Sequence, residues 1–325
     1  NILPNADALF LTAIDPYGHE LWRWTFPVNK LNQQTEQLSP LSSRPTYTET
    51  ENDLTVKANK RTFIFSKKDG QLKGVSVDNR KISFANGPRF IGARRADRSL
   101  DQFYNHDDEK AKEKDRTYSE FPDAAVFTKL DVKQDGGDLV VTANYKLGNL
   151  DKAQWTINPS GDLALDYTYN FSGVVDLMGI RFDYPEDQVI SKRWLGAGPY
   201  RVWQNRIHGT QYDVWENDYN DPIPGETFTY PEFKGYFGDV SWMNIQTKEG
   251  TISLTNETPD AYIGVYQPRD GRDRLLYTLP ESGISVLNVI PPVRNKVNST
   301  DLCGPSSQPK WVNGPQTGRV IFRFM

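Results

Sequence analysis

The residues best suited to chemistry gather in one segment rich in aromatic rings, amides and charge. Flat aromatic rings stack on the apolar faces of sugars, while amide, guanidinium and imidazole groups form hydrogen bonds with sugar hydroxyls. The segment therefore predicts carbohydrate binding. The alternative is that each tryptophan anchors a long loop on a sheet, since Trp side chains are highly buried on average. The candidates for carbohydrate contact are Arg201, Trp203, Asn205, Arg206, His208 and Trp215.

Groups that could cleave a glycosidic bond are not evident in the chain. A retaining glycosidase needs two carboxylates about 5 Å apart on a rigid frame. Glu226, Glu232 and Glu257 show no spacing that would bring two of them together, and we interpret them as solvated loop charges. We therefore predict no catalytic residue here and no glycosidase activity from this chain alone.

Sugar epimerisation is a second hypothesis. Opening a pyranose ring takes a base at the anomeric hydroxyl and an acid at the ring oxygen, typically Glu and His. His208 is the one histidine near the aromatic segment, whereas His106 lies in a charged run. A lone loop histidine is more often a solvated surface residue. A free-standing aldose epimerase is thus one alternative, and a lectin-like or purely structural module is another.

Metal and cofactor sites are not indicated, and we expect neither. One cysteine, Cys303, and three histidines leave little material for a Cys or His cluster. Asp218, Asn220 and Asp221 could offer oxygen ligands to Ca²⁺. A run of Asn and Asp is more typical of a turn, however.

The amino-acid composition excludes some classes of binding partner. The chain has 325 residues, with 38 Lys and Arg against 42 Asp and Glu and a formal net charge of -4. This near balance argues against nucleic acid and membrane as partners, because both require a basic face. No stretch approaches the roughly 18 apolar residues of a membrane helix. Aromatic residues make up 12% of the chain, which is common in all-β proteins and carbohydrate binders.

Strands must position the candidate residues. Segments 139–145, 163–171 and 320–324 alternate apolar and polar side chains, the pattern of half-buried antiparallel strands. Asp-Gly and Gly-Gly pairs separate the strands, because these residues tolerate the positive φ of tight β-turns. The only helical pattern is a charged run at 107–116 without an apolar face. Many strands with almost no helix predict an all-β sandwich or barrel.

The chain divides into three regions. Residues 1–30 contain two apolar strands, which cannot bury both of their faces and so belong to a domain mostly outside this sequence. Residues 31–46 have the composition of a linker, and residues 47–325 form one large β domain. The chain opens on Asn1 without a basic-then-apolar leader. We therefore expect a processed product or an excised fragment.

Several motifs resemble one known family. The run Trp-Leu-Gly-Ala-Gly-Pro within 194–206, followed by Asn-Arg, resembles the C-terminal small-chain domain of glycoside hydrolase family 2 β-galactosidases. Residues 59–72 look like the opening hairpin of that domain, and 155–166 like its central hairpin. Residues 231–242, ending Gly-Asp-Val-Ser-Trp, are similar to its Asp-Val-Arg-Trp strand. The first thirty residues look like the last strands of the preceding immunoglobulin-like domain.

The resemblance implies a fold, and it implies that catalysis takes place in another domain. The fold is a supersandwich of two large antiparallel sheets, shared with galactose mutarotases. The catalytic barrel lies upstream in the same polypeptide or on a separate large chain. In the family, the small-chain domain closes one side of the active-site cleft and can donate an aromatic residue to a distal sugar subsite. Tyr236, Asp239 and Trp242 thereby join the candidate carbohydrate contacts.

The chain also departs from the family pattern. Residues 92–98 lack the usual acidic cluster, and Tyr236-Phe237-Gly238 replaces the usual Asn-Arg-Thr. These departures put lactose-type specificity in doubt and point to a divergent branch that acts on another glycan or on none. The expected ligand is a galactoside or another plant or host glycan. The family further implies a periplasmic or secreted location.

Overall fold

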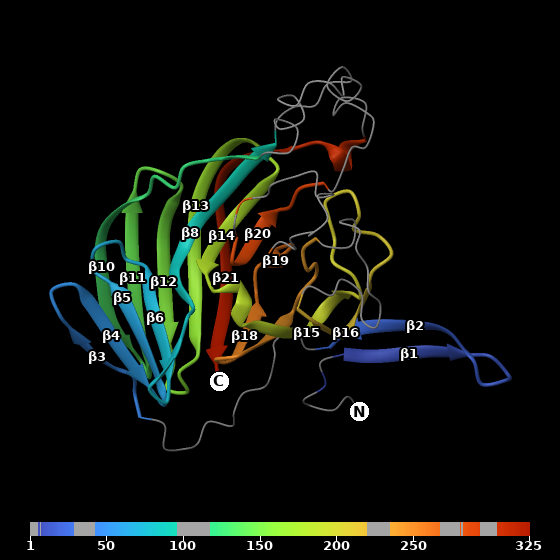
Figure 1. Ribbon diagram of the computed structural model, residues 1–325, viewed down its shortest axis with the longest axis horizontal. Helices are drawn as coiled ribbons and strands as arrows, with labels where there is room; N and C mark the ends of the chain where they lie inside the picture. Colours follow the sequence, from blue (N-terminus) through green and yellow to red (C-terminus); the bar gives the residue numbers. More distant parts are fainter. Residues whose placement is uncertain are drawn as a thin grey trace.

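β-strands dominate the computed structural model, which describes residues 6, 8–28, 43–95, 118–219, 235–266, 280, 282–292 and 304–325. The strands of these residues form three sheets, and all their paired neighbours run antiparallel (Figure 1). The described helices are short 3₁₀ turns, η1 (Glu186–Gln188) and η4 (Pro305–Ser307). No described helix has the length and hydropathy needed to cross a bilayer. The helical pattern expected at 107–116 lies outside the described residues.

The larger two sheets contain nearly all the strands. The nine-stranded sheet has the order β10-β11-β12-β13-β21-β18-β17-β15-β16. Its strands are β10 (Val126–Asp135), β11 (Asp138–Lys146), β12 (Leu150–Ile157), β13 (Leu163–Val175), β15 (Val189–Gly198), β16 (Gln211–Asp218), β17 (Trp242–Thr247), β18 (Gly250–Asn256) and β21 (Lys310–Phe324).

The ten-stranded sheet has the order β19-β20-β14-β8-β6-β5-β4-β3, with β7 added to β6 and β9 to β8. Its strands are β3 (Thr46–Glu49), β4 (Asp53–Ala58), β5 (Arg61–Ser66), β6 (Leu72–Val77), β7 (Arg80–Ile82), β8 (Ala85–Arg95), β9 (Tyr118–Glu120), β14 (Leu177–Asp183), β19 (Tyr262–Val265) and β20 (Ile284–Val289).

Strand β13 confirms the expected alternation. Leu165, Tyr167 and Tyr169 are buried, while Asp166 and Thr168 between them are only half-buried. The turn glycines also behave as expected, with φ of +60° at Gly136 and +80° at Gly161. This left-handed region admits glycine without a steric penalty.

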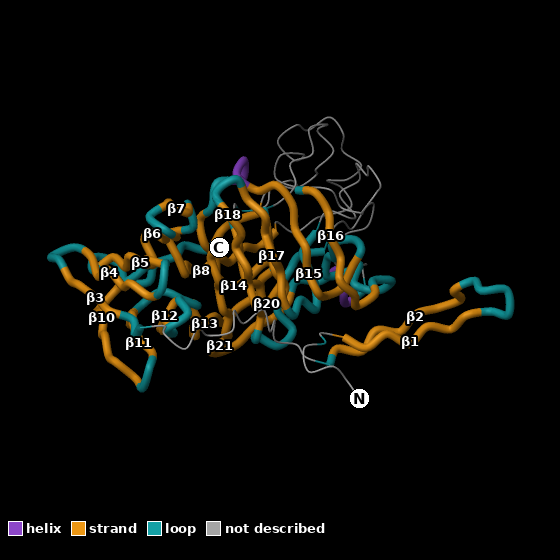
Figure 2. The backbone as a smooth tube through the Cα atoms, turned by 90° about the horizontal axis from the view of Figure 1, so that it is seen from below, coloured by secondary structure: helices purple, strands orange, loops and turns teal. Residues whose placement is uncertain are grey.

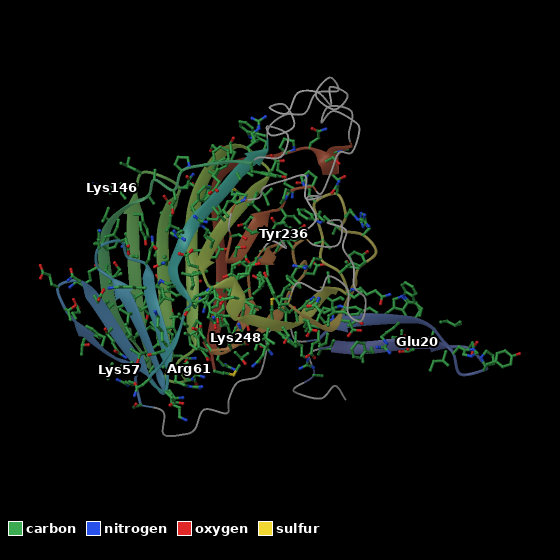
Figure 3. The ribbon with its side chains drawn as sticks, in the orientation of Figure 1. Glu20, Lys57, Arg61, Lys146, Tyr236 and Lys248 are labelled. Atoms are coloured by element: carbon green, nitrogen blue, oxygen red, sulfur yellow. The ribbon has the colours of Figure 1, made fainter. Side chains whose placement is uncertain are left out.

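The two large sheets pack face to face around one aromatic core. Phe65 of β5 lies 5.9 Å from Trp155 of β12, and Phe84 lies 5.0 Å from Phe322 of β21, between ring centroids. The buried Arg61 side chain, labelled in Figure 3, donates hydrogen bonds to the carbonyl oxygens of Phe324 at 2.7 Å and Ser160 at 2.6 Å. The expected large antiparallel sandwich is therefore confirmed.

The third sheet is a separate hairpin of β1 (Ala8–Ile14) and β2 (Glu20–Pro27). These are the two strands expected before the linker. The hairpin extends away from the sandwich (Figure 2) and touches it beside β16, where Arg23 lies 3.8 Å from the Asp213 carboxylate. Most of the expected linker lies outside the described residues, and Thr46 already begins β3. The assignment of the hairpin to an immunoglobulin-like domain stays a prediction.

Candidate carbohydrate site

The first five residues of the Trp-Leu-Gly-Ala-Gly-Pro motif lie on a strand, and Pro199 follows its end. Strand β15 continues to Gly198 and pairs with β16 from Ser191 onward. A Cβ atom at Gly198 would lie 2.4 Å from the Trp215 ring. The absence of a side chain therefore lets the indole of Trp215 lie directly on the β15 backbone. The adjacent Trp194 is fully buried, and its Nε1 donates to the Ala197 carbonyl oxygen at 3.0 Å.

The loop after β15 packs on the outer face of the ten-stranded sheet. Trp203 and Tyr236 are 2% and 1% exposed, and their rings meet edge to face at 5.7 Å. Val202 exchanges both backbone hydrogen bonds with Tyr236, at 2.7 and 2.8 Å. These residues share a second apolar cluster, separate from the main core, with Ile91, Ala93, Tyr118, Leu177, Leu287 and Ile290. The arrangement matches the anchoring alternative for Trp203, because a fully covered ring offers no face for stacking.

Two more of the expected contact residues are buried. Trp242 is covered, with the Arg193 guanidinium 5.8 Å from its ring. Arg201 is also covered, and its guanidinium lies 5.7 Å from the Phe237 ring. A cation beside an aromatic face is attracted by the ring quadrupole, most strongly where water is excluded. Arg201 therefore packs inside the protein. Figure 3 shows that Tyr236 also lies within the body of the molecule.

The other five expected residues reach the surface to different degrees. Arg206, His208 and Asp239 are exposed, while Asn205 and Trp215 are half-buried. The His208 carbonyl oxygen accepts a hydrogen bond from the Tyr200 hydroxyl at 3.1 Å. No carboxylate among the described residues forms an ion pair with His208. The acid and base that an epimerase requires are thus not brought together around His208 in the described part of the chain.

Tyr262 is a polar neighbour of this region that the sequence did not point to. Its ring lies 3.7 Å from the position that a Cβ atom of Gly238 would take, beside Asp239. Burial, followed by the negative charges of Asp239 and Asp260, raises the pKa of the Tyr262 hydroxyl. That hydroxyl therefore stays protonated and can donate a hydrogen bond. No sequence signal marked it, because it stands in an ordinary apolar strand.

A second polar contact lies beside Asp239. The Tyr212 and Ser241 hydroxyls are 2.6 Å apart. Ser241 is buried. The Asp239 carboxylate and the Tyr212 and Tyr262 hydroxyls lie on neighbouring segments and can hydrogen-bond to a sugar, although nothing in this set resembles a glycosidase carboxylate pair. Of the glutamates considered as free loop charges, Glu257 instead pairs with Arg319 at 2.9 Å. Glu226 and Glu232 lie outside the described residues.

Most of the Asn and Asp run that could have offered oxygen ligands to Ca²⁺ lies outside the described residues. Asp218 ends β16, while Asn220 and Asp221 lie outside the described residues. The described residues contain no group of three or more His, Cys, Asp or Glu side chains that could hold a metal ion.

Solved structures of several enzymes resemble this chain. Galactose 1-epimerase from Lactobacillus acidophilus NCFM is 8% identical with a TM-score of 0.44, over 87% of this chain and 99% of that one. A mutarotase homologue from Salmonella typhimurium is 9% identical with a TM-score of 0.37, over 88% and 94%. A copper-containing benzylamine oxidase from Hansenula polymorpha is 7% identical with a TM-score of 0.34, over 86% and 60%.

Comparison of the sequences gives a more specific result. No curated protein matches the chain. The family described as beta galactosidase small chain, however, matches residues 57–291, well over half of the sequence. The match contains all four segments whose motifs suggested that resemblance, at 59–72, 155–166, 194–206 and 231–242. The chain belongs to the β-galactosidase small-chain family.

Proposed function

We propose that this chain is the non-catalytic C-terminal module of a glycoside hydrolase family 2 enzyme of the β-galactosidase type. It packs beside a catalytic barrel carried upstream in the same polypeptide or on a separate large chain. Its exposed polar residues contribute contacts to a galactoside or another plant or host glycan. Family membership supports the parent enzyme class, and the surface of the hairpin supports the packing.

The observation that carries the proposal is the apolar face of the β1–β2 hairpin. In the register of the two strands, Leu9 lies opposite Phe26, Leu11 opposite Trp24 and Ala13 opposite Trp22, all on one side. Those large side chains are between 44% and 56% exposed. The opposite side carries Arg23, which packs on the Phe10 ring at 5.3 Å and approaches Asp213.

Such a hairpin needs further cover. A two-stranded sheet is at best marginally stable by itself, and a contiguous exposed apolar face marks an interaction surface. We infer that additional strands of an immunoglobulin-like domain, from the upstream part of the parent polypeptide, lie on this face. That contact would hold the sandwich in a defined position beside the barrel.

The first test is enzymatic. The isolated chain is expected to leave p-nitrophenyl β-galactoside unhydrolysed, since the proposal places both catalytic carboxylates on the barrel. In the parent polypeptide, deletion of residues 47–325 is expected to reduce galactosidase activity to background. Turnover by the isolated chain, or full activity after the deletion, would contradict the proposal.

The second test concerns the hairpin. The double substitution Leu11→Lys, Trp24→Lys is expected to lower the thermal midpoint of the parent polypeptide, because it places two charges in a covered apolar contact. The same change should leave the sandwich of the isolated chain as stable as before. Leu147→Lys serves as the control, since that leucine is 73% exposed on the sandwich itself. Equal effects in parent and isolated chain would argue against the inferred cover.

A further inference from the structure

The outer face of the nine-stranded sheet carries a groove at β12, β13 and β21. Its volume is about 370 Å³, within the range of pockets that take small molecules. The floor is the solvent side of these strands, and the turn after β18 forms one wall. Trp203 and its loop cover the outer face of the other large sheet, so this groove is separate from them.

Two rows of polar side chains cross the floor in register. In one row, Lys152 lies opposite Thr168, which lies opposite Thr317. In the next row, Gln154 lies opposite Asp166, which lies opposite Arg319. Neighbouring strands are about 4.8 Å apart, and successive residues on one face about 6.8 Å apart. The six side chains thus form a regular grid of hydrogen-bonding groups, on the scale of the hydroxyls of linked sugar rings.

Four of these side chains have free hydrogen-bonding capacity. Lys152, Gln154, Thr168 and Thr317 make no side-chain hydrogen bond or ion pair within the described part of the chain. Together they provide an ammonium group, a carboxamide and two hydroxyls on adjacent strands. A ligand with several hydroxyl groups could satisfy all of them at once.

The wall of the groove is held rigidly. The Thr258 hydroxyl donates to the Arg319 carbonyl oxygen at 3.0 Å and accepts from the Arg319 backbone N–H at 2.9 Å. The Asn256 side chain donates to the Val240 carbonyl oxygen at 3.2 Å and accepts from the Thr258 backbone N–H at 3.1 Å. Glu257 and Pro259 on this turn are therefore held in place, which reduces the entropy lost on binding.

The charges favour a neutral ligand. Arg319 contacts the Asp166 carboxylate with Nη1 and the Glu257 carboxylate with Nε, the latter at 2.9 Å. These two carboxylates and the cations of Arg319 and Lys152 cancel in formal charge. An acidic sugar would gain one attraction, to Lys152, and would face repulsion from Asp166 and Glu257.

We propose that this groove binds a neutral oligosaccharide across β12, β13 and β21. The six floor residues donate to and accept from its hydroxyls, and Pro259 supplies an apolar edge. The site does not depend on the function proposed above, since it requires neither a barrel nor a cover on the hairpin.

The test is calorimetric titration of the full chain with neutral galacto-, gluco-, manno- and xylo-oligosaccharides of three to six units. Oligogalacturonates of the same lengths form the acidic arm. At least one neutral series is expected to bind, and more tightly than the acidic series. The double variant Gln154→Leu, Thr168→Val should weaken that binding about tenfold or more, because two direct hydrogen bonds are lost.

Matched controls separate the groove from other surfaces. Thr48→Val makes the same substitution on the exposed strand β3 of the other sheet and should leave the affinity unchanged. The proposal is overturned by the absence of neutral binding at millimolar concentrations, by unchanged affinity in the double variant, or by tighter binding of oligogalacturonates. Equal thermal midpoints of all variants show that the fold is retained.

Discussion

At the scale of single residues, the tryptophans divide into anchors and surface rings. Trp203 and Trp242 were candidates for stacking on sugars, and both are buried. Trp311 on β21 was not among the candidates from the sequence, and its side chain is 72% exposed. All three residues are tryptophans, and they differ in the residues that pack around them. An indole in a motif with polar residues is therefore weak evidence for a binding surface.

This division predicts a large difference in stability. Trp203→Ala should lower the free energy of unfolding by about 3–5 kcal/mol, because it empties a packed site under the loop. Trp311→Ala should change it by less than about 0.5 kcal/mol, as is usual for exposed positions. Urea unfolding followed by far-ultraviolet circular dichroism measures both. Similar costs for the two variants would contradict the anchoring role of Trp203.

At the scale of elements, the packing between β15 and β16 depends on two glycines in β15. Gly198 lies under the Trp215 indole, and Gly196 lies against the backbone of residues 238–240. Glycine is a frequent turn residue. In the structure these two glycines permit close approach of other groups to an extended strand, which is the other recognised use of glycine.

Gly198→Ala is therefore expected to destabilise the protein by about 1–3 kcal/mol through overpacking against the Trp215 ring. Adding Trp215→Ala should recover much of this loss, and the double-mutant cycle measures the coupling. Gly74→Ala is the control, because nothing lies within 4 Å of its added Cβ atom. Purely additive effects of the two changes would show that the contact does not explain the glycine.

At the scale of the whole molecule, the sandwich buries several tyrosine hydroxyls between its sheets. Burial raises the pKa of Tyr167 to about 12. Burial raises the pKa of Tyr169 as well, and the nearby Tyr167 adds to this effect. Ionisation of either phenol would place a negative charge where water is largely excluded. The folded state therefore holds these protons more tightly than the unfolded chain, where the pKa of tyrosine is about 10.

The sign of the pH dependence follows from this difference. Below pH ~10 both states are protonated, so this contribution to stability is fully present. As the pH rises from ~10 towards the folded value of about 12, the unfolded chain releases protons first. Stability should fall by up to about 1.4 kcal/mol per pH unit for each such group. Urea unfolding between pH ~8 and ~11.5 measures this slope.

Tyr167→Phe should make the decline with pH shallower. Tyr17→Phe changes a tyrosine that is 86% exposed in the hairpin and should leave the slope unaltered. An unchanged slope in Tyr167→Phe would mean that its phenol does not contribute to the alkaline loss of stability.

The sequence by itself determined the local structure and the family. Alternation along β13 and the turn glycines arise from neighbouring residues, so the strands, the all-β class and the small-chain motifs could be read directly. The surface available to a ligand could not be predicted from the sequence, because burial depends on residues far apart in the chain. Tertiary packing covered Trp203 with Tyr236 and placed Lys152, Thr168 and Thr317 in one row across three strands. Strand register brings such residues together, and register is a property of the folded sheet.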